Sequence, residues 1–205
     1  MTARNWNVPV VVLLAALVLP SLAFASDALS IGAKMPMMDA KMKNVDGAMV
    51  SIGEVKGDKG TLVIFTCNHC PYVKAWEERT VALANKATKD GYGVIAINAN
   101  DPTEYKDDGF DHNVKRAKNT GMMYPYVVDS GSKLAKAFGA TRTPEFFLFD
   151  ANDALIYHGA LDDNAQDASA VSATYLQDAM TAHMSGQPMK MATTKSVGCS
   201  IKFYK

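Results

Sequence analysis

The chain has 205 residues, of which 48% are hydrophobic and 20% are charged. This length and composition are typical of one globular domain with a full hydrophobic core, and they exclude a disordered or fibrous chain. Lys plus Arg and Asp plus Glu each total 21, so no excess of positive charge indicates a nucleic-acid partner. No long basic run indicates a surface that binds anionic lipid.

The first 25 residues have the pattern of a secretory signal peptide. Arg4 is the only charged residue before Asp27, and a predominantly apolar run extends from Val8 to Phe24. An Ala-Phe-Ala sequence then ends at Ala25, and small residues at this spacing mark a cleavage site. We therefore expect cleavage after Ala25 and a periplasmic or secreted protein with no stable membrane insertion after cleavage. The alternative is an uncleaved anchor, because a run of roughly 17 residues lies at the lower edge of a bilayer-spanning length.

The first half of the remaining chain alternates β-rich apolar runs with helical patterns. Residues 61–65 read Thr-Leu-Val-Ile-Phe, a short continuous apolar run that is typical of a buried strand. A helical pattern starts near Cys70 and ends at Asp90 before a glycine. In chain order, we predict an irregular N-terminal extension with a short edge strand at 26–47, strands at 49–52, 61–65 and 92–98, a helix at 70–90, a polar loop at 99–108 and a helix at 109–120.

The second half adds a hairpin and a last helix. We predict strands at 125–129, 146–149 and 155–161, helices at 132–138 and 169–184, and a C-terminal tail at 186–205. Asn152 and Asp153 predict the turn that joins the last two strands as an antiparallel hairpin. This order of elements predicts an α/β fold in which helices flank a mixed central β-sheet. The folded domain is expected to span 26–185.

Two of the three cysteines form a Cys-x-x-Cys motif at Cys67 and Cys70, where a strand ends and a helix begins. The free N–H groups and partial positive charge of a helix N-terminus stabilise a thiolate, which is the form that attacks disulfides. Two intervening residues let the sulfurs meet, so the pair can cycle between dithiol and disulfide. We assign the nucleophile role to Cys67, expected to be the more exposed sulfur, and the resolving role to Cys70. An imidazolium at His69 would favour the thiolate and shift the pair toward an oxidant.

Three other interpretations of these residues stay open. A Cys67–Cys70 bridge could be purely structural, although closing so small a loop removes little chain entropy. His69 could be a solvent-facing loop residue. The motif could also be half of a zinc site, but the candidates for the other ligands form no paired motif, so we predict no metal and no organic cofactor. Those candidates are Cys199, His112, His158 and His183.

A second motif, Thr143-Pro144, opens the strand predicted at 146–149. Proline has no backbone N–H to donate to a sheet. It is either an ordinary edge or turn proline, or a cis-proline that holds the preceding carbonyl toward the reactive sulfur and a substrate backbone. The residue pattern alone does not separate these two interpretations.

Together, these motifs resemble the thioredoxin superfamily and, more closely, the peroxiredoxin-like redoxin group of exported or bacterial proteins. The resemblance rests on the segments 65–74, 97–101, 143–150, 157–163 and 198–202. It implies a thioredoxin-like fold, a cis-proline and redox activity, but it does not fix the substrate. We expect a disulfide- or thiol-containing protein substrate and a redox partner. The site residues that the resemblance implies are Cys67 and Cys70, supported by Thr66, Asn68, His69, Thr143 and Pro144.

The sequence departs from this group at two places. The group often carries another cysteine just before the Thr-Pro, where this chain has Arg142. The cysteine near the C-terminus is kept as Cys199, but the proline expected upstream is missing from residues 194–197. Cys199 is therefore an additional redox candidate whose role stays open.

The peroxiredoxin pattern P-x-x-x-T-x-x-C tests a second reaction. It places Cys70 at the peroxide-reducing position, with Cys67 in place of the Thr and Val63 in place of the first Pro. The family's Arg falls on Pro144, although Arg142 could serve instead. Because the usual polar support for a peroxide is lacking, we favour thiol–disulfide exchange on exported proteins or small thiols. A thiol peroxidase is the first alternative, and a non-enzymatic binding module with a structural disulfide is the second.

Overall fold

The computed structural model describes Met1 and residues 28–205. The predicted signal peptide, with its cleavage site after Ala25, lies outside the described residues apart from Met1. Within the described part of the chain, none of the helices has the length and apolar character needed to cross a membrane.

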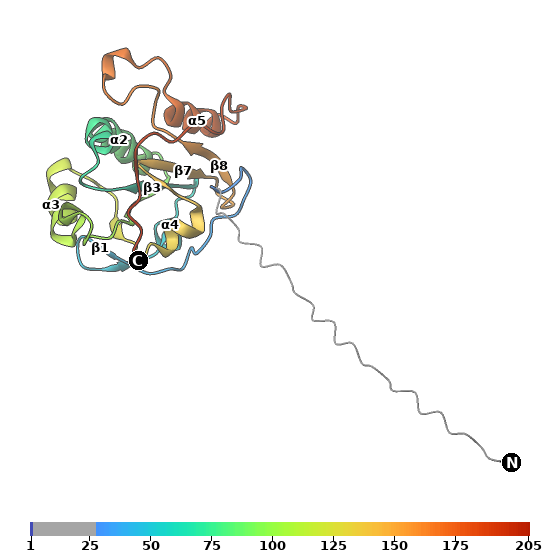
Figure 1. The fold of residues 1–205 in the computed structure, drawn as a ribbon. Coiled ribbons are helices and arrows are strands. Elements are labelled where there is room, and N and C mark those ends of the chain that lie inside the picture. Colours follow the sequence, from blue (N-terminus) through green and yellow to red (C-terminus); the bar gives the residue numbers. More distant parts are fainter. Residues whose placement is uncertain (2–27) are drawn as a thin grey trace.

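A seven-stranded mixed sheet forms the centre of the molecule, with the strand order β2-β1-β5-β4-β3-β7-β8 (Figure 1). Its strands are β1 (Met42–Asn44), β2 (Met49–Val50), β3 (Thr61–Thr66), β4 (Gly93–Asn98), β5 (Tyr126–Val128), β7 (Glu145–Phe149) and β8 (Leu155–Gly159). β3, β4 and β5 run parallel, whereas β7 is antiparallel to both β3 and β8. β3 and β4 are buried at every residue, which confirms them as the buried strands that their apolar runs predict.

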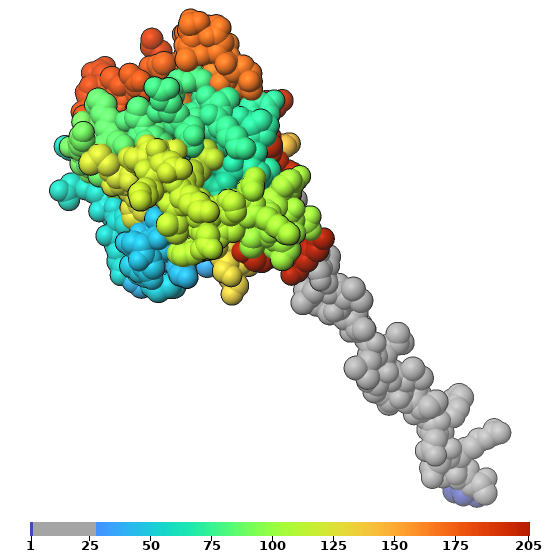
Figure 2. Space-filling model, turned by 90° about the vertical axis from the view of Figure 1, so that its left-hand side faces the viewer, coloured from blue at the N-terminus to red at the C-terminus, as the bar shows by residue number. Residues whose placement is uncertain are grey.

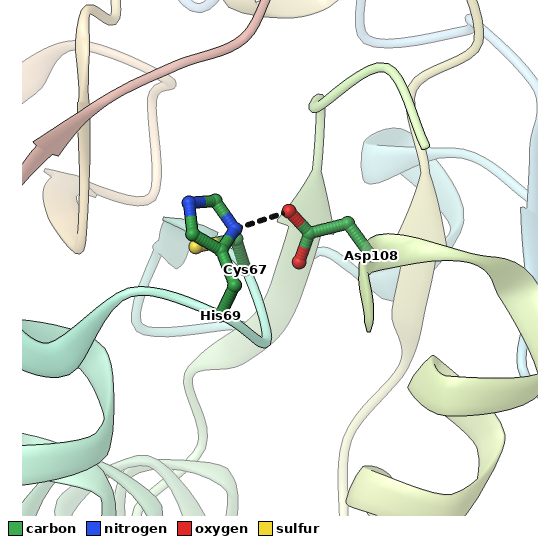
Figure 3. A group of neighbouring side chains, drawn as sticks. All are labelled: Cys67, His69 and Asp108. Carbon is green, nitrogen blue, oxygen red and sulfur yellow. Dashed lines mark hydrogen bonds and ion pairs between the residues drawn. The ribbon is translucent and has the colours of Figure 1, made fainter. Parts of the chain in front are cut away.

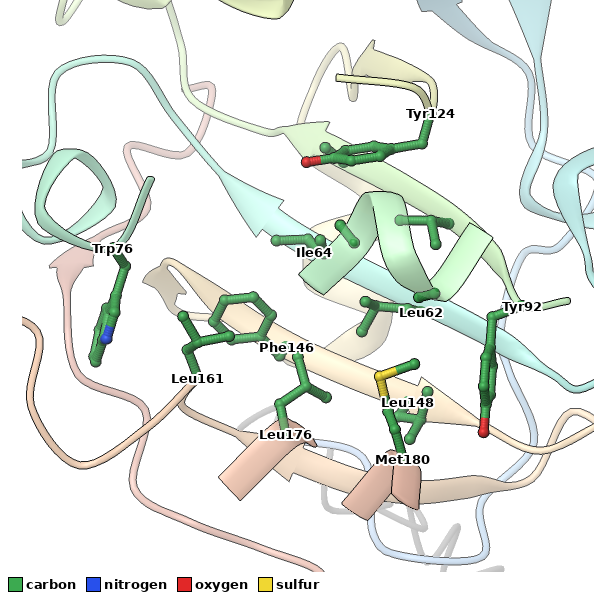
Figure 4. Packing of buried hydrophobic residues seen from close by; sticks show 14 of the residues in the cluster. Leu62, Ile64, Trp76, Tyr92, Tyr124, Phe146, Leu148, Leu161, Leu176 and Met180 are labelled. Atoms are coloured by element: carbon green, nitrogen blue, oxygen red, sulfur yellow. The ribbon is translucent and has the colours of Figure 1, made fainter. Parts of the chain in front are cut away.

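Helices cover both faces of this sheet. They are α1 (Ile52–Val55), α2 (Pro71–Lys89), α3 (Phe110–Thr120), α4 (Lys133–Phe138) and α5 (Tyr175–Met184), with single 3₁₀ turns η1 (Lys106–Asp108) and η2 (Ala168–Ala170). Successive residues of a strand face opposite sides of a sheet. Leu62 and Ile64 of β3 therefore pack on the side of α2 and α5 (Figure 4), which also includes Ala117 of α3. Val63 and Phe65 pack with α1 and α4. The predicted α/β architecture is confirmed.

Trp76 of α2 ties the start of this helix to the loop after β8. Its side chain is 2% exposed, and its Nε1 donates a hydrogen bond to Asp162 Oδ1 at 2.6 Å. Arg79, one turn further along α2, binds the other oxygen of Asp162. The position of α2 against the sheet is thus fixed close to its N-terminal end.

Two predicted boundaries are wrong for local reasons. The strand predicted at 49–52 stops earlier, because Ser51 caps α1 and forms a capping box with Glu54. The helix predicted at 169–184 begins at Tyr175, because Asp167 caps the separate turn η2 through the backbone N–H of Ser169. Both errors arise where a capping side chain outweighs the apolar pattern.

The C-terminal tail predicted at 186–205 packs along the domain. It first runs beside β8, where Gly159 has a φ of 148° and a Cβ would lie 2.0 Å from Thr194 Oγ1. It then forms β9 (Cys199–Ser200), which pairs antiparallel with β6 (Arg142–Thr143) as a separate two-stranded sheet. In Figure 1 the tail, drawn in red, runs from α5 toward the β1 side of the sheet. The tail is therefore part of the folded unit.

Candidate active site

The Cys-x-x-Cys motif lies where β3 ends and α2 begins. Pro71 occupies the first position of α2, and Cys70 is its N-cap residue. Proline suits this position because the missing N–H would have no partner within the helix. Both cysteines of the motif, and Cys199, are free thiols in the structure. The Cys70 side chain therefore faces the free N–H groups of the first turn of α2.

Both sulfurs of the motif are buried. Cys67 and Cys70 are each 0% exposed, so the expectation that Cys67 is the more exposed sulfur is wrong. The reason lies in distant parts of the chain and in α2 itself. Cys199 of β9 and Tyr72 pack against the pair and, with Val73, complete a small apolar cluster around it.

Thr143, the last residue of β6, contacts both sulfurs. Cys67 Sγ lies 3.1 Å from Thr143 Oγ1, and Cys70 Sγ lies 3.2 Å from the Thr143 carbonyl oxygen, to which the neutral thiol donates. The peptide bond between Thr143 and Pro144 is cis, the isomer that the family resemblance implies. The structure thus brings together four of the residues that the sequence singles out.

The two motif thiols affect each other's pKa in opposite directions. The neighbouring Cys67 thiol lowers the pKa of Cys70, burial opposes this, and the Cys199 thiol and the Val73 backbone lower the pKa further. The neighbouring Cys70 thiol raises the pKa of Cys67, as do burial and the negative charge of Asp108. These effects favour the thiolate on Cys70 over Cys67. This order of pKa values runs opposite to the roles assigned from the sequence.

Asp108 is a buried carboxylate at the end of η1, within what the sequence predicts only as a polar loop. It is 3% exposed, and its Oδ2 lies 2.5 Å from His69 Nδ1 (Figure 3). Its Oδ1 accepts the backbone N–H of Asn68 at 2.6 Å, and Asn100 Nδ2 donates to Oδ2 at 2.8 Å. Two of these bonds hold the residues between the cysteines, so Asp108 fixes the shape of the motif.

His69 is positioned on two sides. Besides its bond to Asp108, its ring is stacked on the ring of Tyr105, with the ring centroids 3.9 Å apart. The His69 side chain is 12% exposed. The alternative of a solvent-facing loop histidine is therefore wrong.

Asn68 has hydrogen-bond partners at both ends of its amide. Its Nδ2 donates to the Asp107 carbonyl and to Asn113 Oδ1, both at 2.6 Å, and its Oδ1 accepts from Tyr126 Oη at 3.0 Å. Since buried polar groups cost free energy when unpaired, this set of partners locks the Asn68 side chain in one orientation. These bonds brace the backbone between the two cysteines.

Glu145, the first residue of β7, is a second buried carboxylate of the site. Its Oε2 accepts the backbone N–H groups of Thr141 and Arg142 at 2.8 and 2.9 Å, and its Oε1 lies 2.7 Å from His158 Nε2. Burial by itself would raise the pKa of Glu145, but these hydrogen bonds outweigh it and lower the pKa. Glu145 therefore fixes the start of β6, the strand that carries Thr143.

Thr66 and Arg142 make contacts of other kinds. Thr66 is buried at the end of β3 and, with Val73 and Pro144, lines a cavity of about 20 Å³ beside the proline. Arg142 is exposed, and its Nη1 donates to the Gly198 carbonyl at 3.5 Å. Thr66 thus contributes packing, and Arg142 contacts the tail.

Three side chains, those of Cys67, His69 and Asp108, each bring one possible metal-ligand atom to the same place. These three atoms lie within 4.8 Å of one another. His69 Nδ1 and Asp108 Oδ2, however, are 2.5 Å apart, whereas two ligands of tetrahedral zinc are separated by about 3.3 Å. This spacing is that of a hydrogen bond. His158 and His183, candidates for the zinc alternative, are instead paired with Glu145 and Tyr92.

Comparisons with known proteins agree with this architecture. The family model described as Redoxin matches residues 30–174. The thiol-disulfide oxidoreductase ResA of Halalkalibacterium halodurans is 23% identical over 116 residues, which are 56% of this chain and 61% of that protein. The chain thus spans less than two thirds of the length of this relative.

Solved structures extend the similarity. An uncharacterized conserved protein from Geobacillus kaustophilus is 35% identical, with a TM-score of 0.79 over 85% of this chain and 93% of that one. A peroxidoxin from Mycobacterium tuberculosis, 13% identical, shares the fold with a TM-score of 0.57 over 77% of this chain and 98% of its own. The thioredoxin domain of a thiol-disulfide oxidoreductase from Bacteroides vulgatus, 17% identical, does so with 0.51 over 65% and 90%. The predicted thioredoxin-like fold is confirmed, and the chain belongs to the Redoxin family.

Proposed function

We propose that this chain is a thiol–disulfide oxidoreductase that works through Cys67 and Cys70. The observation that carries the proposal is the pair of free thiols packed together at the N-cap of α2, with Cys67 Sγ 3.1 Å and Cys70 Sγ 3.2 Å from oxygens of Thr143. Thiolate stabilisation at one sulfur and a proton-bearing thiol at the other are what disulfide exchange requires. The names of ResA and of the Bacteroides relative support the same chemistry.

The two cysteines carry both electrons of the reaction, so no cofactor enters it. The Cys70 thiolate attacks one sulfur of a substrate disulfide, and the other substrate sulfur leaves as a thiolate and takes up a proton. Cys67 then loses its proton and attacks Cys70 Sγ of the mixed disulfide, which releases the second substrate sulfur. The products are a Cys67–Cys70 disulfide and a reduced substrate, and the reverse steps oxidise a dithiol.

We place this activity outside the cytoplasm, in the periplasm or in the secreted fraction. The support is the signal-peptide pattern that ends at Ala25. The substrates are proteins or small molecules that carry thiols or disulfides, and a second redox protein returns the pair to its starting state. N-terminal sequencing of the exported protein tests the location, with Ser26 expected as the first residue.

The decisive measurement is the reduction potential of the Cys67–Cys70 pair in the mature protein. We would equilibrate the Cys199→Ser variant in glutathione buffers and count thiols in the two motif cysteines by mass spectrometry. A value near −120 to −180 mV identifies an oxidant or isomerase, and a value near −270 mV identifies a reductant. A pair that does not equilibrate at all is a structural bridge and overturns the proposal.

The rate of reaction with one equivalent of hydroperoxide distinguishes thiol–disulfide exchange from the peroxidase alternative. Thiol–disulfide exchange predicts slow thiol loss with peroxide, at the rate of an ordinary cysteine. Rapid sulfenate formation at either motif cysteine would instead identify a thiol peroxidase.

A further inference from the structure

The folded chain buries the motif sulfurs, so a protein partner can reach them only after the covering tail moves. Disulfide exchange needs direct attack on sulfur, yet Cys67 and Cys70 are each 0% exposed. Cys199 is half-buried and packs against them, which makes it the most accessible sulfur of the cluster. Cys199 is therefore the first sulfur outside the motif with which the buried pair can exchange a disulfide.

The tail is shaped to hold Cys199 at this place. In the β6–β9 pair, Cys199 lies directly opposite Thr143, whose two oxygens contact the motif sulfurs. The preceding residue, Gly198, passes so close that a Cβ on it would lie 2.1 Å from the Thr143 carbonyl oxygen. A glycine at this position thus permits the approach that sets Cys199 beside Cys70.

We propose that Cys199 is a third redox-active cysteine, which exchanges a disulfide with Cys70 and transfers it to or from a thiol-containing protein partner. This inference rests on the proposed function of the Cys67–Cys70 pair. It assigns to β9 the task of carrying disulfide equivalents between a buried pair and the surface.

The exchange conserves disulfides and electrons at every step. Starting from the Cys67–Cys70 disulfide, the Cys199 thiol loses its proton and attacks Cys70 Sγ, and Cys67 leaves and takes up a proton. A partner thiolate then attacks Cys199 Sγ, and Cys70 leaves as a thiolate. A second partner thiol attacks the partner's sulfur of the mixed disulfide, which releases Cys199 and leaves the partner oxidised and the chain fully reduced.

The acidities of Cys70 and Cys199 favour the release of Cys70 in the second step. Burial, followed by the hydrogen bond to Cys70, raises the pKa of Cys199 to about 11, whereas the pKa of Cys70 is lowered. Because the more acidic thiol is the better leaving group, a partner thiolate that attacks Cys199 expels Cys70 readily. The reverse attack, at Cys70, would require the less acidic Cys199 to leave and would have to reach a fully buried sulfur.

The tail can present Cys199 without detaching from the domain. Upstream, Thr194 is held by β8, since its backbone N–H donates to the His158 carbonyl at 3.0 Å. Downstream, Ile201 N–H donates to the Thr141 carbonyl at 2.9 Å. The segment 195–198 between these anchors includes Val197, which is 37% exposed. A local movement of this short segment is enough to admit a partner chain.

The test is to trap the predicted disulfide in the Cys67→Ser variant, whose mature form retains Cys70 and Cys199 as its only thiols. After oxidation with glutathione disulfide at pH 7, peptide mapping under non-reducing conditions should show an intramolecular Cys70–Cys199 bridge in most of the monomer. Recovery of glutathione adducts on Cys70, with Cys199 still a free thiol, would overturn the proposal.

Gly198→Ala in the same Cys67→Ser background serves as the matched variant. It leaves both thiols in place and displaces β9 from Thr143, so the yield of the bridge should fall at least fivefold. An unchanged yield would show that chain flexibility, rather than the β6–β9 geometry, brings the sulfurs together, and it would count against the proposal.

Kinetics on the otherwise unmodified protein separate this inference from the proposed function. With reduced, unfolded ribonuclease as the probe, Cys199→Ser should slow substrate oxidation at least tenfold while the Cys67–Cys70 pair still equilibrates with glutathione. An unchanged rate overturns the role of Cys199 alone. Failure of the pair to equilibrate with glutathione overturns the proposed function itself. Ser200→Ala, at the exposed neighbouring position, is the control for disturbance of the strand.

Discussion

The two segments that enclose the motif sulfurs, residues 67–70 and the tail, are held in different ways. The first is braced by buried side chains, with Asp108 and Asn68 forming hydrogen bonds as short as 2.5 and 2.6 Å. The tail is held largely by main-chain bonds of a two-residue strand and by single contacts such as Lys202 N–H to Asn100 Oδ1 at 2.8 Å. Strongly buried networks are rigid, whereas short strands at the surface open at low cost.

This difference indicates how the site can keep a fixed geometry at the sulfurs and still open to a partner. The sulfurs and the residues between them keep a fixed geometry for exchange, and only the tail has to move to admit a partner. Asn100 joins the two segments, because its Nδ2 donates to Asp108 and its Oδ1 accepts from the tail. Variants in the braced segment and variants in the tail should therefore have different effects on activity and stability, and these effects are given below from the largest to the smallest.

The largest effect is expected at the sulfurs. Cys70→Ser removes the stabilised thiolate and should lower the rate of disulfide exchange by about 10³-fold or more, with little change in the fold. Insulin reduction and the oxidation of reduced ribonuclease measure it in the two directions. Retention of more than a tenth of the activity would mean that the thiolate at the N-cap of α2 is not the reacting sulfur.

A large loss of stability is expected when Asp108, which braces residues 67–70, is changed. Asp108→Asn removes the charge that binds His69 and one acceptor of the loop, so the free energy of unfolding should fall by about 2–4 kcal/mol. The pKa of Cys67 should also fall, because the Asp108 charge is one of the causes that raise it. Urea unfolding and thiolate absorbance at 240 nm measure the two effects. Asp107→Asn, at the exposed neighbour, should change neither.

The pH dependence of stability tests the Glu145 carboxylate, which holds the start of β6 next to the tail. Since the pKa of Glu145 is lowered by folding, its contribution is fully present above about pH 4.5, the ordinary value. It is then lost as the pH falls toward the lower pKa of the folded state. Urea unfolding between pH 7 and pH 3 should show this decline, and Glu145→Gln should flatten it. An identical pH profile in the two proteins would contradict this role for the carboxylate.

The smallest effect is expected on the tail itself. Ser196→Ala removes one hydrogen bond, from Ser196 Oγ to Glu145 Oε1 at 3.0 Å, which is worth about 1 kcal/mol. Local opening should become about five times more frequent, and alkylation of the motif cysteines by iodoacetamide should accelerate by the same factor. Thr181→Ala, which removes one hydrogen bond at an exposed position of α5, is the matched control and should leave the alkylation rate unchanged.

Much of the fold was predictable because it is encoded locally. The apolar runs of β3 and β4 and the glycine-terminated helices α3 and α4 carry their signals within a few residues. The same is true of the Cys-x-x-Cys motif, whose place at a strand–helix junction follows from the adjoining patterns. The family resemblance supplied the thioredoxin-like arrangement and the implied cis-proline.

The parts that escaped prediction depend on contacts between distant residues. Asp108 lies 39 positions from His69 in a polar loop, where a carboxylate is ordinary, and only the adjacency of β3 and β4 brings the two together. The burial of Cys67 is likewise set by Cys199, more than 130 positions away, on a tail without periodic pattern. Glu145 was visible inside a recognised motif, but nothing local indicated its four partners.

Trp76 gives the molecule an intrinsic optical probe. The chain has two tryptophans, and the other, Trp6, lies in the predicted signal peptide, so the exported form would emit from a single indole. That indole is buried about 9 Å along α2 from Cys70, and Tyr72, whose ring centroid is 6.5 Å away, links it to the sulfur cluster. Because disulfides quench tryptophan fluorescence at short range, the emission of the unlabelled protein should follow the oxidation of its own cysteines in real time.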